Sequence, residues 1–129
     1  GLDALWAGRV GVPVLLVSGD DKACAEARAT LGKAVETAQV KTGLGRHCAR
    51  MLAPKAARAL IEEKARAALA NAAKREPFRM KPPYEVKLKY TSTAHLDGIL
   101  FDGQRRERLD GQTIIYRTDE LVEALSRQV

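Results

Sequence analysis

A short apolar segment at residues 12–17, Val-Pro-Val-Leu-Leu-Val, constrains the fold of this chain more than any other feature. Because it is nearly continuous and does not alternate with polar residues, it is typical of a parallel strand that is buried on both faces of a sheet. A glycine and two aspartates follow it, and residues 22–31 then place Cys24 and Ala27 at helical spacing before Gly32 ends the pattern. A strand, a tight turn and a helix form the first part of a βαβ unit, which predicts an α/β protein.

The segments that follow extend this pattern. Residues 35–40 are predicted to form a second strand beside the first, residues 41–46 a glycine-containing loop, and residues 47–52 one or two helical turns. Residues 54–74 carry the strongest helix pattern, which opens with a proline at the first helical position. The predicted apolar stripe of this helix consists of Ala57, Leu60, Ile61, Ala65, Ala68, Leu69 and Ala72.

Three prolines mark residues 76–83 as a linker between an α/β segment, residues 1–75, and a second part, residues 84–129. Residues 84–90 alternate cleanly and predict a half-exposed strand. A short helix at 94–101, a turn at Asp110-Gly111, a strand at 113–117 and a final helix after Asp119 are expected beyond it; the face of that helix is Leu121, Val122 and Leu125.

These elements predict a βαβ-type, mostly parallel sheet packed by helices, with a smaller α+β part at the C-terminal end. Residues 2–8 resemble the end of a helix whose beginning is missing, with Gly8 just past its last turn. The chain is therefore expected to be a fragment or a processed subunit, about half of a larger domain.

The charge distribution indicates which partners the chain can bind, and the cysteines indicate its redox compartment. The net charge is +6, but basic and acidic residues are interspersed along the chain, which favours a solvated surface over a nucleic-acid patch. No apolar run approaches the ~20 residues that span a bilayer. Cys24 and Cys48 lie among alanines in helix-like stretches and are expected to be buried free thiols. A reducing compartment follows, and the cytoplasm is predicted.

Gly19, Asp20 and Asp21 stand where the first strand ends, the edge at which open α/β sheets bind ligands. Two adjacent carboxylates could hold a metal or act as an acid and a base. The alternative is structural: Gly19 makes the turn, and Asp20 or Asp21 caps the following helix. Helix starts need a capping side chain far more often than catalytic sites occur, so we favour the structural role.

Lys41 and Arg46 flank the glycine-containing loop and are the best candidates for contacts to an anion, because the loop is expected at the same sheet edge. The loop lacks the pattern of a dinucleotide fingerprint or a P-loop. His47 and His95 have no partner at the spacing of metal ligands. The residues alone therefore assemble no active site.

The same residues resemble a family, the bacterial zinc-dependent D-aminopeptidases of the dipeptide-transport-operon type. The resemblance begins at residues 11–21, with a Val-Pro-Val strand followed by Gly-Asp-Asp, and continues at residues 35–41 and 52–57. Gly45-Arg46 and Ala49-Arg50 also match, and a weaker match closes at residues 110–113. It covers essentially all of this chain but only the C-terminal half of the family's domain.

The resemblance implies a homo-oligomeric hydrolase that removes D-amino acids such as D-alanine from the N-terminus of short peptides. Zinc would polarise the scissile carbonyl and activate water. The family's zinc ligands lie on an N-terminal Ser-x-Asp-x-Glu-Gly motif, on histidines and on a Gly-Glu segment, and none of these is found here. The N-terminal half of the same enzyme is thus the implied partner, no catalytic or metal residue transfers to this chain, and Lys41 and Arg46 are candidates for shaping the substrate chamber.

Two other functions stay open at this point. One is a stand-alone α/β domain that binds anionic ligands at the loops containing Gly19 and Gly43. The other is a nucleic-acid-binding module that uses Lys87, Lys89 and Tyr90 on an exposed strand, and steep salt dependence would distinguish it.

Overall fold

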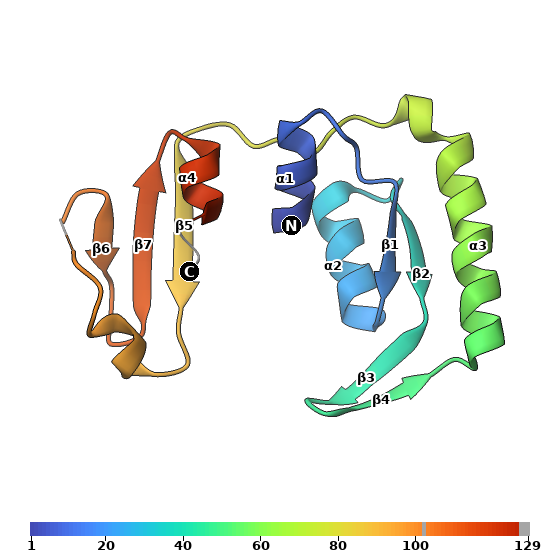
Figure 1. Cartoon of the computed structure of the whole chain (residues 1–129), viewed down its shortest axis with the longest axis horizontal. Helices are drawn as coiled ribbons and strands as arrows, with labels where there is room; N and C mark the ends of the chain where they lie inside the picture. The colour runs from blue at the N-terminus through green and yellow to red at the C-terminus, as the bar shows by residue number, and fades with distance from the viewer. Residues whose placement is uncertain (102, 127–129) are drawn as a thin grey trace. The chain divides into compact units, whose positions relative to one another are not determined.

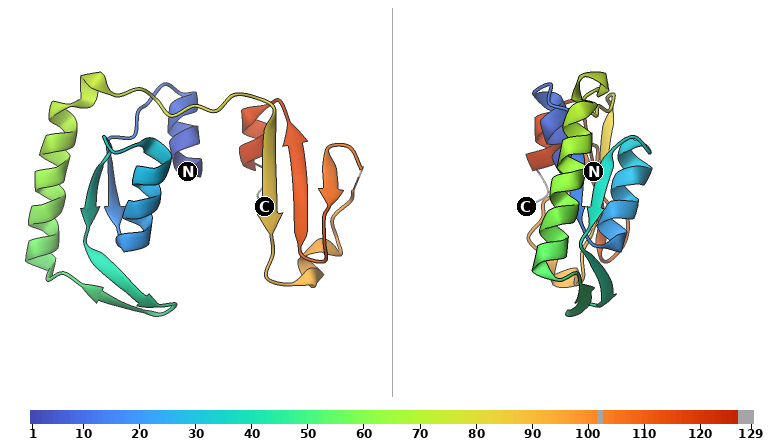
Figure 2. Two further views of the ribbon diagram at one scale, coloured as in Figure 1. Left: turned by 180° about the vertical axis from the view of Figure 1, so that it is seen from behind. Right: turned by 90° about the vertical axis from the view of Figure 1, so that its right-hand side faces the viewer.

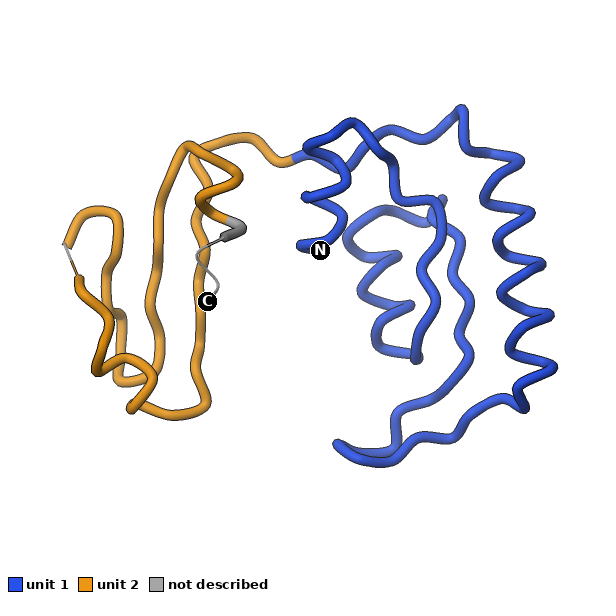
Figure 3. Tube along the Cα trace, viewed as in Figure 1, with its two compact units in different colours: residues 1–79 blue, residues 80–129 orange. Residues whose placement is uncertain are grey.

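A computed structural model describes residues 1–101 and 103–126 of the chain. The chain divides into two compact units, Gly1–Arg79 and Met80–Val129 (Figure 3). The division between Arg79 and Met80 falls inside the proline-containing segment 76–83.

The first unit is an α/β unit built around one parallel pair of strands (Figure 1). Strands β1 and β2 pair from Leu16 opposite Glu36 to Gly19 opposite Gln39, and helices α2 and α3 lie on either side of the pair (Figure 2). The α/β class predicted from the sequence is confirmed. Parallel pairing is limited to these two strands in the described part of the chain, and the other sheets are antiparallel. The elements are α1 (Leu2–Arg9), β1 (Leu16–Gly19), α2 (Asp21–Leu31), β2 (Glu36–Gln39), β3 (Lys41–Gly45), β4 (Cys48–Met51), α3 (Pro54–Ala70) and the 3₁₀ turn η1 (Ala72–Lys74).

Strand β1 is shorter and more exposed than the apolar segment 12–17 predicts. Its hydrogen-bonded ladder starts only at Leu16, and Val12 is 53% exposed. The reason is that β1 pairs only with β2 among the described strands, so one of its edges has no strand beside it. An apolar sequence with the composition of a central strand thus occupies an edge position in this chain.

The two long helices follow their sequence signals. Gly32, with a φ of 85°, ends α2, whose Cys24 and Ala27 are buried against the sheet. Pro54 occupies the first turn of α3, as predicted, and Lys64 of α3 pairs with Glu36 of β2 at 3.5 Å. Leu69 is an exception to the predicted stripe: its side chain is 68% exposed, although Ala68 beside it is buried.

Gly8 does not end α1, as the sequence pattern predicts, but lies buried inside it. The backbone of Phe78 packs against this position so closely that a Cβ there would be 1.8 Å from the Phe78 carbonyl oxygen. The left-handed glycine that follows the helix is Gly11, with a φ of 79°. The absence of a side chain at Gly8 therefore allows close packing of the segment before Arg79 on α1.

Residues 41–52 form an antiparallel hairpin instead of the predicted loop and helical turns. Strands β3 and β4 pair from Lys41 opposite Met51 to Gly45 opposite Cys48, with a bulge between Gly43 and Gly45. The backbone N–H of Leu52 donates to the Val40 carbonyl at 3.0 Å and closes the base of the hairpin. The cross-strand partners decided this structure, because the glycines give the segment no helical or strand periodicity of its own.

The second unit is a three-stranded antiparallel sheet in the order β5-β7-β6 with one helix. The predicted alternation in β5 is confirmed, with its even-numbered residues facing inward. The predicted helix at 94–101 is only a 3₁₀ turn that Ser92 caps at its start, and the charged strand β6 was not predicted. The elements are β5 (Tyr84–Lys89), η2 (Thr93–Leu96), β6 (Arg106–Arg108), β7 (Thr113–Thr118) and α4 (Leu121–Ser126).

Small and aliphatic side chains dominate both cores, as the composition predicts. The buried apolar residues of the second unit include Leu96, Ile114, Ile115, Tyr116 and Ala124, while the side chain of Leu125 lies outside those that the structure describes. On β7, the Arg117 guanidinium joins Glu85 of β5 and Glu107 of β6 at 3.0 and 3.1 Å. No helix in the described ranges has both the length and the apolar character that crossing a bilayer requires.

Candidate functional site

The carboxyl ends of β1 and β2 lead directly into the polar residues that the sequence analysis singled out. β1 ends at Gly19, followed by Asp20 and Asp21, and β2 continues through Val40 into the hairpin. The Val40 N–H donates to the Gly19 carbonyl at 2.9 Å, which holds the two strand ends together. This is the edge of a parallel pair at which α/β proteins bind ligands.

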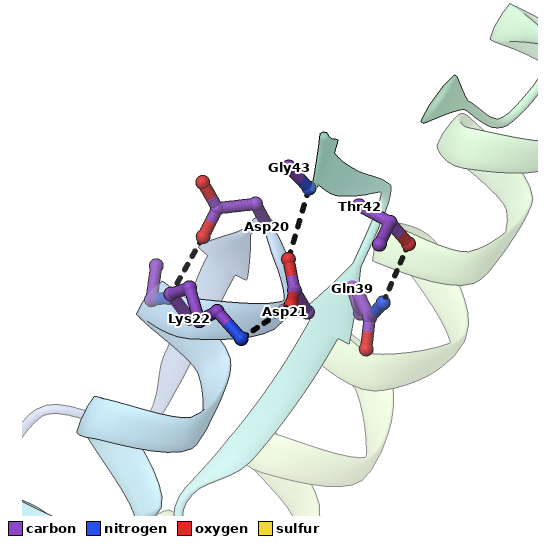
Figure 4. A network of polar contacts seen from close by, with 7 residues as sticks. Asp20, Asp21, Lys22, Gln39, Thr42 and Gly43 are labelled. Carbon is purple, nitrogen blue, oxygen red and sulfur yellow. Dashed lines mark hydrogen bonds and ion pairs between the residues drawn. The ribbon is translucent and has the colours of Figure 1, made fainter. Parts of the chain in front are cut away.

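Asp20 is the N-cap residue of α2. Its backbone is extended, as is typical of an N-cap residue. Its Oδ1 accepts a hydrogen bond from the Ala23 N–H at 2.8 Å and so satisfies one of the unpaired donors of the first helical turn (Figure 4). Gly19 precedes it at a point where a Cβ would lie 3.0 Å from the Ala23 Cβ, so the strand end and the helix start approach closely.

Asp21 has a different role, because it ties α2 to the hairpin. Its Oδ1 accepts a hydrogen bond from the Gly43 N–H at 2.9 Å, and its Oδ2 lies 3.2 Å from the Lys22 ammonium (Figure 4). The Gly43 hydrogen bond, with a smaller effect of Lys22, lowers the pKa of the Asp21 carboxyl below its ordinary value. No local sequence pattern indicates this bond, since the two residues are 22 positions apart.

Replacing Asp21 by asparagine is expected to remove the pH dependence of the Gly43 hydrogen bond. Because folding lowers the pKa of Asp21, its contribution to stability is complete above the ordinary value of 3.8 and is lost as the pH falls through the lower folded value. In an NMR titration the Gly43 amide should therefore shift with a midpoint below 3.8 in the parent chain and stay constant in Asp21→Asn. The Gln112 amide, which donates to Asp110 at 2.7 Å, should titrate in both. An unchanged Gly43 titration in the variant would assign the effect to another group.

One face of the hairpin forms an open pocket of about 620 Å³. Lys41 and Arg46, the two predicted anion contacts, both line it, and His47 and Cys48 join them there. Its full lining is Asp20, Lys41, Gly43, Gly45, Arg46, His47, Cys48, Ala49 and Met51.

The placement of His47 and Cys48 differs from the sequence interpretation. Cys48 was expected to be a buried thiol, but it is exposed because it begins β4 and not a packed helix, whereas Cys24 is buried as expected. Burial raises the pKa of the Cys24 thiol. His95 belongs to the other unit, where its ring stacks on Tyr90 with the ring centres 5.7 Å apart.

The described residues bring two cations to this edge and no cluster of metal-ligand side chains. In the described ranges no three His, Cys, Asp or Glu side chains come close enough together to hold a metal ion. Asp20 and Asp21 both accept backbone hydrogen bonds that have structural roles. The cations Lys41 and Arg46 remain exposed toward the pocket.

Comparisons with known proteins agree on one family. The sequence model of the D-aminopeptidase family, peptidase family M55, matches residues 1–128. A D-aminopeptidase of Bacillus subtilis (strain 168) is 42% identical over 83 residues, which are 64% of this chain and 29% of that protein. The solved structure of the Zn-dependent D-aminopeptidase DppA from Bacillus subtilis, described as a self-compartmentalizing protease, is 29% identical with a TM-score of 0.82. That match covers 98% of this chain and 46% of the solved chain, so this chain spans less than half the length of either relative.

Proposed function

The chain belongs to the D-aminopeptidase family of peptidases, and from this premise we propose that it forms the C-terminal portion of a zinc-dependent D-aminopeptidase. The enzyme would hydrolyse N-terminal D-amino acids from short peptides. The observation that carries the proposal is the structural match to a Zn-dependent D-aminopeptidase across 98% of this chain at 29% identity.

Zinc does not fit the described residues of this chain. The nearest set of potential ligands lines the hairpin pocket, but the carboxylate of Asp20 there already caps α2, and the described residues bring no three such groups together. A catalytic zinc site takes three protein ligands. We therefore assign the zinc ligands to the N-terminal half of the same enzyme and assign no metal or catalytic residue to this chain.

The role proposed for this chain is to complete the sheet and to shape the substrate chamber. The unpaired edge of β1 and the exposed apolar side chains of Leu2, Trp6 and Val12 support a complementary segment that packs here. Lys41 and Arg46 would face the chamber at the carboxyl ends of the parallel strands.

The assembly and compartment are proposals of the same kind. A homo-oligomer is supported by the self-compartmentalizing relative. A cytoplasmic location is supported by two free cysteines, Cys24 and Cys48, which fit a reducing environment. The partners proposed are thus the N-terminal half, further copies of the enzyme and short D-amino-acid peptides.

The test is reconstitution of the chain with the complementary N-terminal segment. The mixed protein should bind zinc stoichiometrically, as measured by elemental mass spectrometry, and release D-alanine from D-alanyl peptides, with no release from the L-alanyl peptides used as a control. The chain alone should do neither, because the described residues lack a ligand set. Stoichiometric zinc and peptide cleavage by the chain alone would overturn the proposal, and so would a mixed protein that binds zinc without releasing D-alanine.

A further inference from the structure

The middle of the pocket face of the β3–β4 hairpin carries the smallest side chains, and larger ones stand at its ends. Because residues alternate between the faces of a strand, Lys41, Gly43, Ala49 and Met51 share one face, and the Thr42–Arg50 pair lies on the other. Gly43 and Ala49 are directly opposite each other, so the middle of the pocket face has almost no side chain above the backbone. An extended ligand could lie along this part of the hairpin.

Neither a left-handed backbone nor a steric clash requires the glycine at position 43, which stands beside the bulge of β3. The φ angle of Gly43 lies outside the left-handed region, and a Cβ added there would meet only the Asp21 Oδ1 at an ordinary 3.8 Å. Glycine within a strand is unfavourable by about 0.5–1 kcal/mol relative to alanine, and it often marks a bulge or a place where a ligand or another backbone approaches closely. The space above Gly43 leaves room for such a ligand.

The ends of this surface carry positive charge. Lys41 stands at the base of the hairpin and Arg46 at its tip, both exposed, and in the described part of the chain neither takes part in an ion pair. The one acidic side chain that lines the pocket, Asp20, is directed to the Ala23 N–H. The planar guanidinium of Arg46 can hold a carboxylate through two parallel hydrogen bonds, and the ammonium at the other end of the surface adds longer-range attraction without a geometric requirement.

We propose that this face binds the free C-terminal carboxylate of a short peptide, with the peptide backbone extended over Gly43 and Ala49. The inference rests on the proposed function and deepens it: the other end of the same peptide substrate, the one that is not cleaved, is recognised by this chain. Such a contact selects short peptides, because the distance between the hairpin and the scissile bond fixes the length of chain that can reach both.

Binding is tested on the 129-residue chain, without any hydrolysis. D-alanyl-D-alanine and its C-terminal amide are titrated into the isotope-labelled chain, and the backbone amides of Gly43, Gly45 and Ala49 are followed by NMR. The dipeptide with a free carboxylate should shift these backbone signals, and the dipeptide with an amidated C-terminus should not. Arg46→Gln should weaken binding of the acid by about tenfold, the effect expected for losing one charged contact, and Lys41→Met should weaken it less, because its charge acts from the other end of the surface. Arg50→Gln is the matched control, since it removes a positive charge from the opposite face of the same hairpin.

Inorganic phosphate at equal ionic strength separates a peptide carboxylate from a general anion site. The assignment to a peptide would be overturned if phosphate bound as tightly as D-alanyl-D-alanine and the dipeptide could not displace it. Equal binding of the dipeptide and its C-terminal amide would also overturn it. In the reconstituted enzyme, Arg46→Gln should raise KM for the peptide acid without changing kcat or the KM of the peptide amide, whereas a merely structural role would alter both substrates alike. The chain could bind the dipeptide acid while the reconstituted protein hydrolyses no peptide. That result would support the carboxylate site and contradict only the proposed function.

Discussion

Replacing Gly8 by alanine is expected to lower the free energy of unfolding of the first unit by about 2 kcal/mol. The new Cβ would lie 1.8 Å from the carbonyl oxygen of Phe78 and 2.9 Å from its carbonyl carbon, whereas real Cβ atoms essentially never approach within 3.0 Å. The collision is with backbone, so α1 or the segment before Arg79 must move. Overpacking of this kind costs about 3 kcal/mol, and the better helix propensity of alanine returns about 1 kcal/mol of it.

The fluorescence of Trp6, the single tryptophan and a residue of α1, reports this loss in urea unfolding experiments. Gly43→Ala is the control within the same unit, because its new Cβ meets the Asp21 carboxylate at an ordinary 3.8 Å and its φ needs no glycine. The control should be no less stable than the parent chain, and more stable by at most about 1 kcal/mol, because alanine is favoured over glycine within a strand. Equal urea midpoints for the two variants would show that α1 does not pack on Phe78 in solution.

Replacing Leu96 by alanine is expected to destabilise the second unit by about 3 kcal/mol. Leu96 is 1% exposed and is the largest fully buried side chain in the chain's described part, in a unit whose core also contains Ile114, Ile115 and Tyr116. The substitution removes buried apolar surface and leaves a cavity, and a core this small has little material with which to fill it.

Hydrogen exchange of the β7 amides measures this effect, since the tryptophan lies in the other unit. Leu100→Ala is the matched control: it makes the same chemical change at a side chain that is 86% exposed, and exchange should barely change. If both leucine variants exchanged at the parent rate, the buried position of Leu96 would be wrong.

The functional edge could be predicted only in part. Lys41 and Arg46 are candidates for anion contacts because they flank a glycine-containing segment after a predicted strand, and the structure brings both to one pocket. The sequence does not predict that His47 and Cys48 line the same pocket, because residues 47–52 are predicted as helical turns and form part of a hairpin in the structure. The hydrogen bond from Gly43 to Asp21, which positions the hairpin, joins residues 22 positions apart and leaves no local pattern.

What the sequence by itself determined are the features whose causes are local. The Asp20 cap, the Gly32 stop, the proline at the start of α3 and the alternation in β5 each depend on residues within a few positions of one another. The family resemblance also rests on short segments of sequence, and the match of the family model to residues 1–128 confirms it.

Only the tertiary structure decided the elements whose stability comes from distant partners. The charged strand β6 exists because it pairs with β7, where Arg117 joins Glu107 and Glu85. The hairpin of β3 and β4 exists because its strands pair with each other and Asp21 holds Gly43, and Gly8 is buried because Phe78 packs on it. A contact between residues far apart in the chain gains its free energy only after the chain has folded, so no short stretch of sequence records it.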